Sequence, residues 1–306
     1  MYLFRTLRQP AYCVFTAFSG FLASLCLFCR VLLLYTAPAR LLRIYRILRI
    51  FRGCINISSN SLLINLSDRL DIRLVSDKLA SDWGKCMAKL ITPAEAVAFF
   101  KNNQTIMIGG FLNCGSPELV IDELLKTDLS GFTLIANDTG EAATNRGKLV
   151  CAGKIKKAIV SHIGTNPETV RLYNEKKIEI DLQPQGSLAE RVRAGGAGLG
   201  GILTPVGVGT EVAQNKKIIT VEGKDYLLEM PLKAEVALVY ATYADRFGNL
   251  AFHGSTRNFN ALMPPAAEVV IAEVEHISDE PLNPDHIAVP GIYVDYLIDG
   301  GCNGTL

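Results

Sequence analysis

The sequence predicts an α/β domain with a mostly parallel sheet, and three observations support this prediction. Short, continuously apolar runs recur from residue 105 onwards, as expected of strands that are covered on both faces. Helix-start signals separate several of these runs, and strands that alternate with helices form parallel sheets. A glycine-rich stretch, residues 109–115, follows the first run and is typical of a strand-to-helix loop in such a sheet.

The helices are predicted from their start signals. Thr92 and Glu95 are spaced as a capping box, with proline between them at the first helical position, so a helix is expected to begin there. A second helix is expected to begin at residues 116–118, where a serine and a proline precede a glutamate. Further helices are expected at residues 167–177 and around residues 188–193.

The strands are predicted from the apolar runs themselves. Glu222 and Gly223 lie between residues 217–221 and 226–228, which predicts a hairpin. The other predicted strands are residues 105–108, 132–136, 158–161, 178–182, 235–240 and 269–273.

Charge divides the chain into two pieces. Residues 1–86 carry 12 Lys and Arg against 4 Asp and Glu, whereas the rest of the chain carries 19 against 26. The net charge of +1 gives no general footprint for nucleic acid, and no nucleic-acid partner is expected. We predict an N-terminal extension, residues 1–86, and a working domain, residues 87–306.

The extension is apolar and rich in arginine. Residues 11–29 form an uncharged run close to the ~20 apolar residues of a bilayer-spanning helix, and arginine recurs at every third position from Arg40 to Arg52. Three interpretations are open: a membrane anchor, an organelle-targeting segment, or non-native upstream sequence before a start at Met87. The third is favoured because every predicted element lies after Met87. A cytoplasmic protein is expected, with membrane association only through the extension.

The cysteines and histidines indicate neither a disulfide framework nor a metal site. Only three of the eight cysteines fall in residues 87–306, which fits a reducing compartment. The four histidines are widely spread and lack the spacing of metal ligands, so no metal is expected.

The glycine-rich stretch is the first candidate site. Ligands of open α/β sheets gather beyond the carboxyl ends of the strands, where this loop lies. Gly109 and Gly110 permit close approach of a ligand, and main-chain N–H groups at the following helix start could hold an anion or a developing oxyanion. The alternative is a plain tight turn. For the binding loop, we expect Gly110→Val to crowd the approach of the ligand while leaving the subunit folded, because the change would fall on a surface turn.

A second glycine-rich stretch, residues 194–201, contains the letters of the dinucleotide fingerprint from Gly196. A helix is expected before these glycines, where the fingerprint requires a strand. We therefore interpret the stretch as a flexible or close-packed loop and not as a dinucleotide site.

No residue can be named as a catalytic nucleophile from its spacing. Cys114 lies in the first glycine loop, but no histidine is locally placed to act as its base. Four carboxylates are also available, and the first two of them fit the first turn of a helix, where they complement the helix dipole. They are Glu118, Glu168, Glu190 and Glu229.

Residues 102–117 resemble the alpha-subunit signature of the family I coenzyme A transferases. The stretch reads Asn-Asn-Gln-Thr-Ile-Met-Ile-Gly-Gly-Phe, then three variable positions, then Gly-Ser-Pro. It is most similar to the alpha subunits of acetate/butyrate–acetoacetate CoA-transferases. Further matching segments follow in unbroken order, at residues 134–139, 161–169, 193–198, 204–210, 257–260, 284–286 and 290–291.

This resemblance implies an open, three-layer α/β/α fold and a transfer of CoA between a short-chain acyl-CoA and a free carboxylate. Acetyl-, acetoacetyl- and butyryl-CoA are the implied donors, and CoA is expected as a substrate, with no permanently bound cofactor. The nucleophilic glutamate would belong to a beta subunit, in an α2β2 complex, so no catalytic residue is expected on this chain. The implied CoA-binding loop is Gly109, Gly110, Phe111, Leu112, Asn113, Cys114 and Gly115.

Other functions remain open. The chain could belong to a 3-oxoadipate or succinate type of CoA-transferase, or to a nucleotide-binding enzyme of the dehydrogenase type on the same fold. A non-catalytic binding protein tethered to a membrane through residues 1–86 is the third possibility.

Overall fold

The computed structural model describes residues 88–301, which are built around a nine-stranded sheet. Every pair of neighbouring strands in it is parallel, except that β10 (Leu250–Ala251) runs antiparallel beside β9. Across the sheet the order is β1 (Lys89–Leu90), β12 (Tyr296–Asp299), β11 (Ala267–Ser278), β9 (Ala234–Asp245), β2 (Thr105–Ile108), β3 (Phe132–Ile135), β4 (Ile155–Val160) and β5 (Glu179–Leu182). The prediction of a mostly parallel sheet is confirmed.

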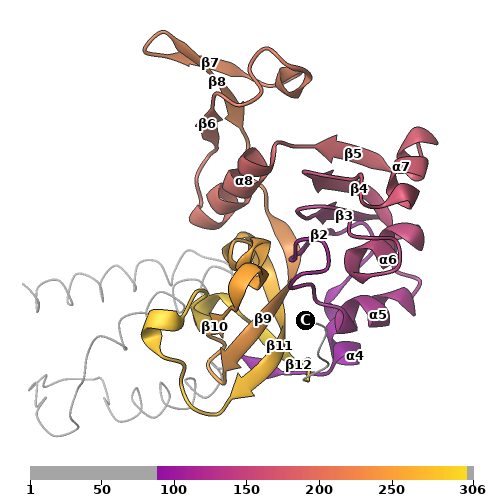
Figure 1. The fold of residues 1–306 in the computed structure, drawn as a ribbon, viewed down its shortest axis with the longest axis vertical. Helices are drawn as coiled ribbons and strands as arrows, with labels where there is room; N and C mark the ends of the chain where they lie inside the picture. Colours follow the sequence, from indigo (N-terminus) through magenta and orange to yellow (C-terminus); the bar gives the residue numbers. More distant parts are fainter. Residues whose placement is uncertain (1–87, 302–306) are drawn as a thin grey trace, which may run out of the picture. The chain divides into compact units, whose positions relative to one another are not determined.

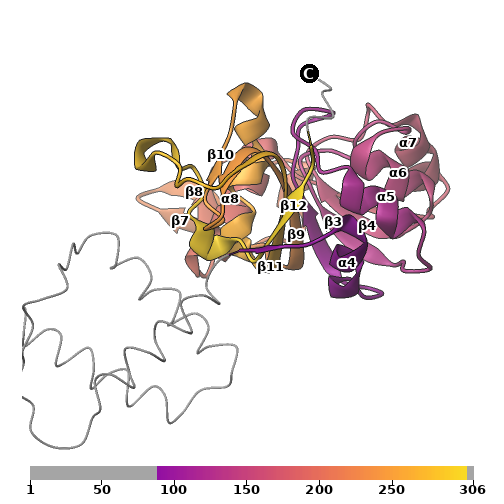
Figure 2. The same ribbon diagram turned by 90° about the horizontal axis from the view of Figure 1, so that it is seen from below.

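Helices cover both faces of this sheet, which gives the three layers seen in Figures 1 and 2. One face carries α4 (Pro93–Ala96) with the 3-10 turn η1 (Val97–Phe99), then α5 (Leu119–Leu125), α6 (Asn145–Cys151) and α7 (Pro167–Asn174). The other face carries α8 (Gln185–Ala197) and the 3-10 turns η4 (Phe259–Ala261) and η5 (Pro264–Ala266).

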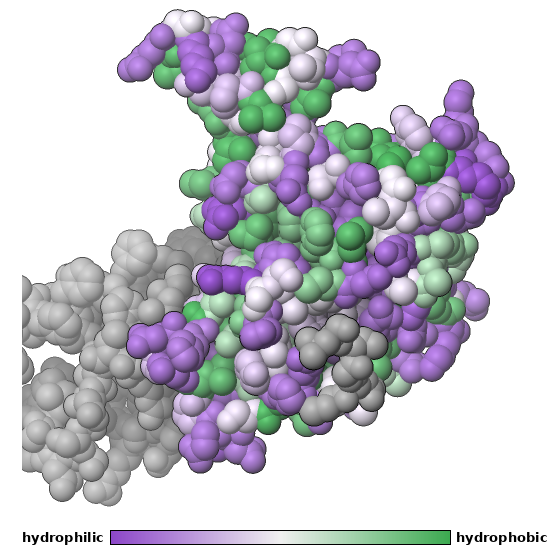
Figure 3. Space-filling view, viewed as in Figure 1, coloured by the Kyte–Doolittle hydropathy of each residue, from purple (hydrophilic) through white to green (hydrophobic). Residues whose placement is uncertain are grey.

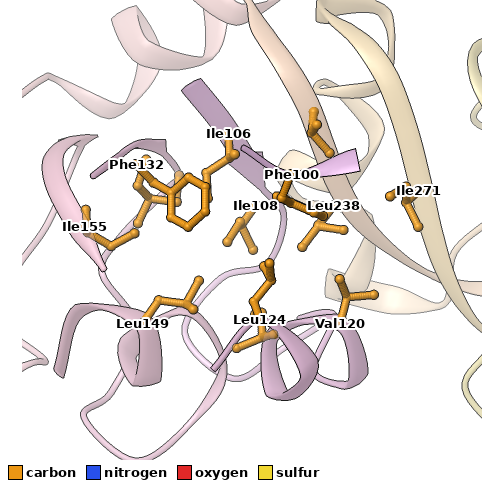
Figure 4. Packing of buried hydrophobic residues seen from close by; sticks show 14 of the residues in the cluster. Phe100, Ile106, Ile108, Val120, Leu124, Phe132, Leu149, Ile155, Leu238 and Ile271 are labelled. Carbon is orange, nitrogen blue, oxygen red and sulfur yellow. The ribbon is translucent and has the colours of Figure 1, made fainter. Parts of the chain in front are cut away.

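Two apolar cores lie between the layers. Ile106 and Ile108 of β2 point towards α5 and pack beside Leu124 and Phe132, as Figure 4 shows. Met107 belongs to the core on the opposite face. The continuous apolar run of β2 thus results from burial of both faces of the strand, as predicted.

The predicted helix starts are confirmed at two places, although the first helix is shorter than expected. Thr92 Oγ1 accepts the N–H of Glu95 at 3.2 Å, and the Glu95 carboxylate accepts the N–H of Thr92 at 2.8 Å. The helix then tightens into η1 after residue 96 and ends at Phe100. At α7, the Asn166 side chain accepts the N–H groups of Glu168 and Thr169. Helix α6 was not predicted, since no side chain caps it and a glycine interrupts its sequence.

The expected loop at residues 194–201 is wrong in part, because α8 continues through these glycines to Ala197. It ends at Gly198, which has a left-handed φ of 72°. A Cβ atom on Gly195 would lie 1.9 Å from the Leu232 carbonyl oxygen, and one on Gly196 would lie 2.7 Å from Pro265. The glycines therefore allow close packing of a helix, and they form no loop that could cradle a pyrophosphate.

After α8 the chain forms a separate three-stranded antiparallel sheet that projects from the larger one (Figure 1). Its strands, in spatial order, are β6 (Ile202–Thr204), β8 (Lys224–Glu229) and β7 (Ile218–Val221). The predicted hairpin at Glu222 and Gly223 is confirmed, and both residues have positive φ. Figure 3 shows apolar surface among the polar side chains of this three-stranded sheet. Leu203 and Val221 are among its exposed apolar residues.

The predictions for residues 1–86 and for a domain start at Met87 concern a segment that lies outside the described residues, and they stay predictions. Within residues 88–301, no helix combines the length and the apolar character that a membrane crossing requires. The cytoplasmic location expected from the cysteines is likewise a prediction.

Candidate functional site

The first glycine-rich stretch leaves the sheet at the carboxyl end of β2, as predicted. Ile108 is the last residue of β2 and pairs with Leu238 of β9, whose carbonyl accepts the N–H of Gly109 at 2.9 Å. Strand β9 continues to Asp245 beside β11, well beyond the end of β2. The loop is thus hydrogen-bonded to β9 at its first residue.

The loop reverses direction in a two-residue turn. The N–H of Phe111 donates to the carbonyl of Cys114 at 3.0 Å, and the N–H of Cys114 donates back at 2.9 Å. Leu112 inside the turn has a φ of 49°, and Gly110 before it has a φ of 107°. The second value lies in a region that side-chain-bearing residues rarely adopt, which explains the glycine at that position.

A buried ion pair supports the loop from one side. The Arg146 guanidinium is fully buried and binds the Asp138 carboxylate, and it also donates to the carbonyl oxygens of Gly109 and Asp138 and to Ser116 Oγ. Asp138 accepts the N–H of Leu112 at 3.0 Å through its other oxygen. One pair thus holds the loop at its beginning, middle and end.

Burial alone would raise the pKa of Asp138, but the Arg146 charge and three further donors outweigh it. These donors are the N–H groups of Leu112 and Gly140 and the amide of Asn137. Together they hold the pKa of Asp138 below its ordinary value, so the pair is ionised at neutral pH.

Two asparagines support the loop from the opposite side. The Asn258 side chain accepts the N–H of Gly110 at 3.1 Å and donates to the Cys114 carbonyl at 3.2 Å. Asn260 donates to the Gly115 carbonyl at 2.7 Å and accepts a main-chain N–H from β9 at 3.0 Å. Both asparagines lie in the segment 257–260 that resembles the family, but the sequence did not show that they touch the loop.

The expectation that Gly110 lies on a surface turn is wrong. The residue is buried, and a Cβ atom there would lie 2.3 Å from Ser116 Oγ and 2.8 Å from Arg146 Nη1. A side chain at this position would displace the support of the loop before it met any ligand.

The N–H groups at the helix start are also not open, contrary to expectation. Those of Glu118 and Leu119 donate to the Glu273 carboxylate of β11 at 3.1 and 2.8 Å. In the loop itself, the N–H groups of Asn113, Gly115 and Ser116 have no hydrogen-bond acceptor among the described residues. Gly115 and Ser116 are buried, and a buried N–H group without a partner is uncommon in a folded protein.

The candidate nucleophiles have structural roles. Cys114 Sγ lies 3.2 Å from the Ser255 hydroxyl. Among the described residues, no histidine is hydrogen-bonded to this thiol. Each of the four carboxylates considered above binds a cation. The pairs are Glu118–Lys148, Glu168–Arg171, Glu190–Arg193 and Glu229–Lys216.

The remaining groups at the mouth of the loop are aromatic and acidic. Phe111 is 46% exposed, although it is a large apolar side chain. Tyr240 of β9 donates its N–H to Asn260, and burial with a hydrogen bond to Glu275 raises the pKa of its hydroxyl above the ordinary value. The site therefore offers main-chain donors and an apolar side chain, which suits binding better than acid–base catalysis.

Comparison with known proteins gives a consistent result. The family model described as coenzyme A transferase matches residues 90–300. The alpha subunit of the acetate CoA-transferase of Escherichia coli K12 is 46% identical over 211 residues, which cover 69% of this chain and 96% of that protein. The alpha subunit of the acetoacetyl-CoA:acetate/butyrate CoA transferase of Clostridium acetobutylicum is 44% identical over 212 residues, or 69% and 97% of the two chains.

Solved structures share the fold at lower sequence identity. Glutaconate coenzyme A-transferase of Acidaminococcus fermentans superposes with a TM-score of 0.62 at 19% identity, over 69% of this chain and 75% of that one. An acyl-CoA transferase of Escherichia coli O157:H7 gives a TM-score of 0.60 at 21% identity. The match covers 70% of this chain and 47% of that chain, so this chain spans about half the length of the longer protein.

Proposed function

The chain belongs to the coenzyme A transferase family, and we propose that it is the alpha half of an enzyme that moves CoA between a short-chain acyl-CoA and a free carboxylate. The observation that carries this proposal is the match to two alpha subunits over 96% and 97% of their lengths, together with a family match over residues 90–300 that includes the glycine loop. Acetate, acetoacetate and butyrate are the proposed acids. CoA is proposed to bind only as a substrate.

The proposed reaction uses a glutamate of the beta subunit. Its carboxylate attacks the carbonyl carbon of the acyl-CoA thioester, and the C–S bond breaks. The CoA thiolate departs as the leaving group, and an acyl-glutamyl anhydride forms. The thiolate then attacks the glutamyl carbonyl, which releases the free acid and leaves a glutamyl-CoA thioester. The same two steps then run in reverse with the acceptor acid. Its carboxylate attacks the glutamyl-CoA thioester and releases the CoA thiolate, which then attacks the acceptor's carbonyl in the new anhydride and frees the glutamate.

The loop supports this role as the half of the site that binds. Each attack develops negative charge on a carbonyl oxygen, and fixed N–H donors stabilise such an oxyanion. We propose the N–H groups of Asn113, Gly115 and Ser116, which have no acceptor among the described residues, as these donors, with residues 109–115 as the CoA-binding loop. Around the loop, the nucleophile candidates of the described residues are committed to other contacts, so the attacking group is proposed to come from the partner.

The first test compares the full-length chain alone with the chain co-purified with a candidate beta subunit. CoA exchange between acetyl-CoA and acetoacetate is expected only in the pair, and mass spectrometry of the trapped intermediate is expected to find CoA on the beta subunit. Full turnover by the isolated chain, or CoA bound covalently to it, would contradict the proposal.

A second substrate class is favoured by other relatives. One chain of a succinyl-CoA:3-ketoacid coenzyme A transferase of Xanthomonas campestris is 43% identical, and one chain of a 3-oxoadipate CoA-transferase of Acinetobacter baylyi is 40% identical. Measuring kcat/KM for acetate, butyrate, succinate and 3-oxoadipate on the same pair decides between the classes. A preference for the two dicarboxylates would replace the acids proposed above.

Phe111→Ala tests whether CoA lies against the loop. Loss of an aromatic contact at a binding site costs about 1–2 kcal/mol, so KM for acyl-CoA is expected to rise roughly tenfold while the melting temperature is unchanged. The matched control is Tyr173→Ala on α7, where an aromatic side chain is 49% exposed at a distance in sequence from the loop. Equal kinetics for the two variants would place CoA elsewhere.

A further inference from the structure

Glu273 is a buried carboxylate whose hydrogen bonds are with the start of the helix that follows the glycine loop. It lies on β11, is 7% exposed, and accepts the N–H groups of Glu118 and Leu119. Helix α5 has no side-chain cap from its own N-cap residue, Glu118. The cap is therefore supplied across the fold, by a residue more than 150 positions away in the sequence.

No cation neutralises Glu273 among the described residues. Glu118 faces it from α5 and is itself paired with Lys148, while Tyr240 lies beside it in register on β9 and Glu275 follows on its own strand. Burial raises the pKa of Glu273 to about 7, although N–H donors from the first turn of α5 act in the opposite direction. Its ionised form thus lowers the stability of the fold, so stability alone gives no reason for a glutamate here.

The position of the carboxylate gives another reason. Residues 115 and 116, whose N–H groups have no acceptor among the described residues, lie immediately before the turn that Glu273 holds. We propose that Glu273 is a positioning residue, which fixes the first turn of α5 and thereby aims the N–H groups of Gly115 and Ser116 at the reacting carbonyl. This inference rests on the function proposed above.

The proposal gives activity and stability opposite dependences on pH. A protonated carboxyl group has one oxygen occupied by a proton, so it cannot accept both N–H groups equally well, and activity is expected to fall as pH decreases through about 7. The native pKa lies above the ordinary value of 4.5, so the folded protein holds the proton more tightly than the unfolded chain. The contribution of Glu273 to stability is therefore highest below about 4.5 and decreases as pH rises through about 7.

The test uses the assembled alpha–beta pair and the variant Glu273→Gln, a neutral side chain of the same shape. At pH 8 its kcat/KM is expected to be roughly 10- to 100-fold below wild type, as for a small misplacement of reacting groups. Amide hydrogen exchange at Glu118 and Leu119 is expected to be about tenfold faster, since a charge-assisted hydrogen bond is lost. The wild-type decrease in kcat/KM around pH 7 is expected to disappear, and the melting temperature is not expected to fall.

The matched control is Glu235→Gln. Glu235 lies at the start of β9 and also accepts a main-chain N–H, from Thr105 at 2.9 Å, but at the opposite end of the sheet from the loop. It is expected to keep the wild-type kcat/KM and pH profile. The beta subunit is the same in every sample, so its own titrations cancel in this comparison.

Two results would overturn the inference. If the amide hydrogens of Glu118 and Leu119 exchange faster in Glu273→Gln but the variant keeps the wild-type kcat/KM and pH profile, the cap does not contribute to catalysis. If its melting temperature falls well below that of Glu235→Gln, the carboxylate supports the fold and not the loop. Inactivity of the wild-type pair towards every acyl-CoA would instead contradict the proposed function, so the two failures are distinguishable.

Discussion

Arg146→Leu is expected to lower the free energy of unfolding by about 3–5 kcal/mol and to reduce CoA transfer to background. Removing one partner of a buried pair leaves the other charge, here that of Asp138, without its counter-ion in a place that water does not reach. The same change removes the donors that hold the carbonyl of Gly109 and the hydroxyl of Ser116. Denaturant unfolding of the purified chain and activity of the assembled pair measure the two effects.

The control for this variant is Arg171→Leu on α7. Arg171 also pairs with carboxylates, those of Glu168 and Glu175, but its side chain is 51% exposed. Exposed ion pairs contribute little to stability, so unfolding and activity are both expected to be near wild type. If Arg146→Leu behaved like Arg171→Leu, the support that we assign to the buried pair would be absent.

Gly110→Val is expected to destabilise the chain by about 3 kcal/mol or more and to abolish activity. The new side chain must adopt a φ of 107° and must occupy space held by Ser116 Oγ and Arg146 Nη1. Overpacking of a buried site commonly costs 1–3 kcal/mol, roughly, and the backbone strain adds to this. A chain that stayed as stable as wild type would show that the loop is more open than the structure indicates.

Gly186→Ala is the matched glycine control. Gly186 lies in the first turn of α8, and a Cβ atom there would meet nothing within 4 Å. Alanine is the better helix former by about 1 kcal/mol, so the variant is expected to be as stable as wild type or slightly more stable. Activity of the pair is expected to be unchanged, because the residue lies apart from the loop.

Of the twelve strands that the structure describes, eight were predicted, because their pattern is local, whereas β1, β6, β10 and β12 were not. Burial of both faces of β2 favours apolar residues at consecutive positions, and this is visible in the letters of Thr105–Ile108. The cap at Thr92 was predicted for the same reason, since donor and acceptor lie three residues apart. Helix α6 escaped prediction because its first turn has no such local partner.

The candidate loop was predictable as a location but not as a set of contacts. Its glycines and its place after the first strand indicated a binding loop, and the resemblance to a family gave the ligand. The residues that hold the loop come from three other parts of the chain: Asp138 and Arg146, then Asn258 and Asn260, then Glu273. Nothing in the spacing of residues 109–118 points to them.

The mostly parallel α/β class, the carboxyl-end position of the loop and the lack of a nucleophile that could be identified by spacing were determined by the sequence alone. They depend on periodicity, turn chemistry and residue type, which act over a few positions. Which N–H groups of the loop and of the following helix start have hydrogen-bond acceptors was decided only by tertiary structure. The partners of Leu112, Gly110 and Leu119 lie 26, 148 and 154 residues away, and only folding of the sheet brings them within hydrogen-bonding distance.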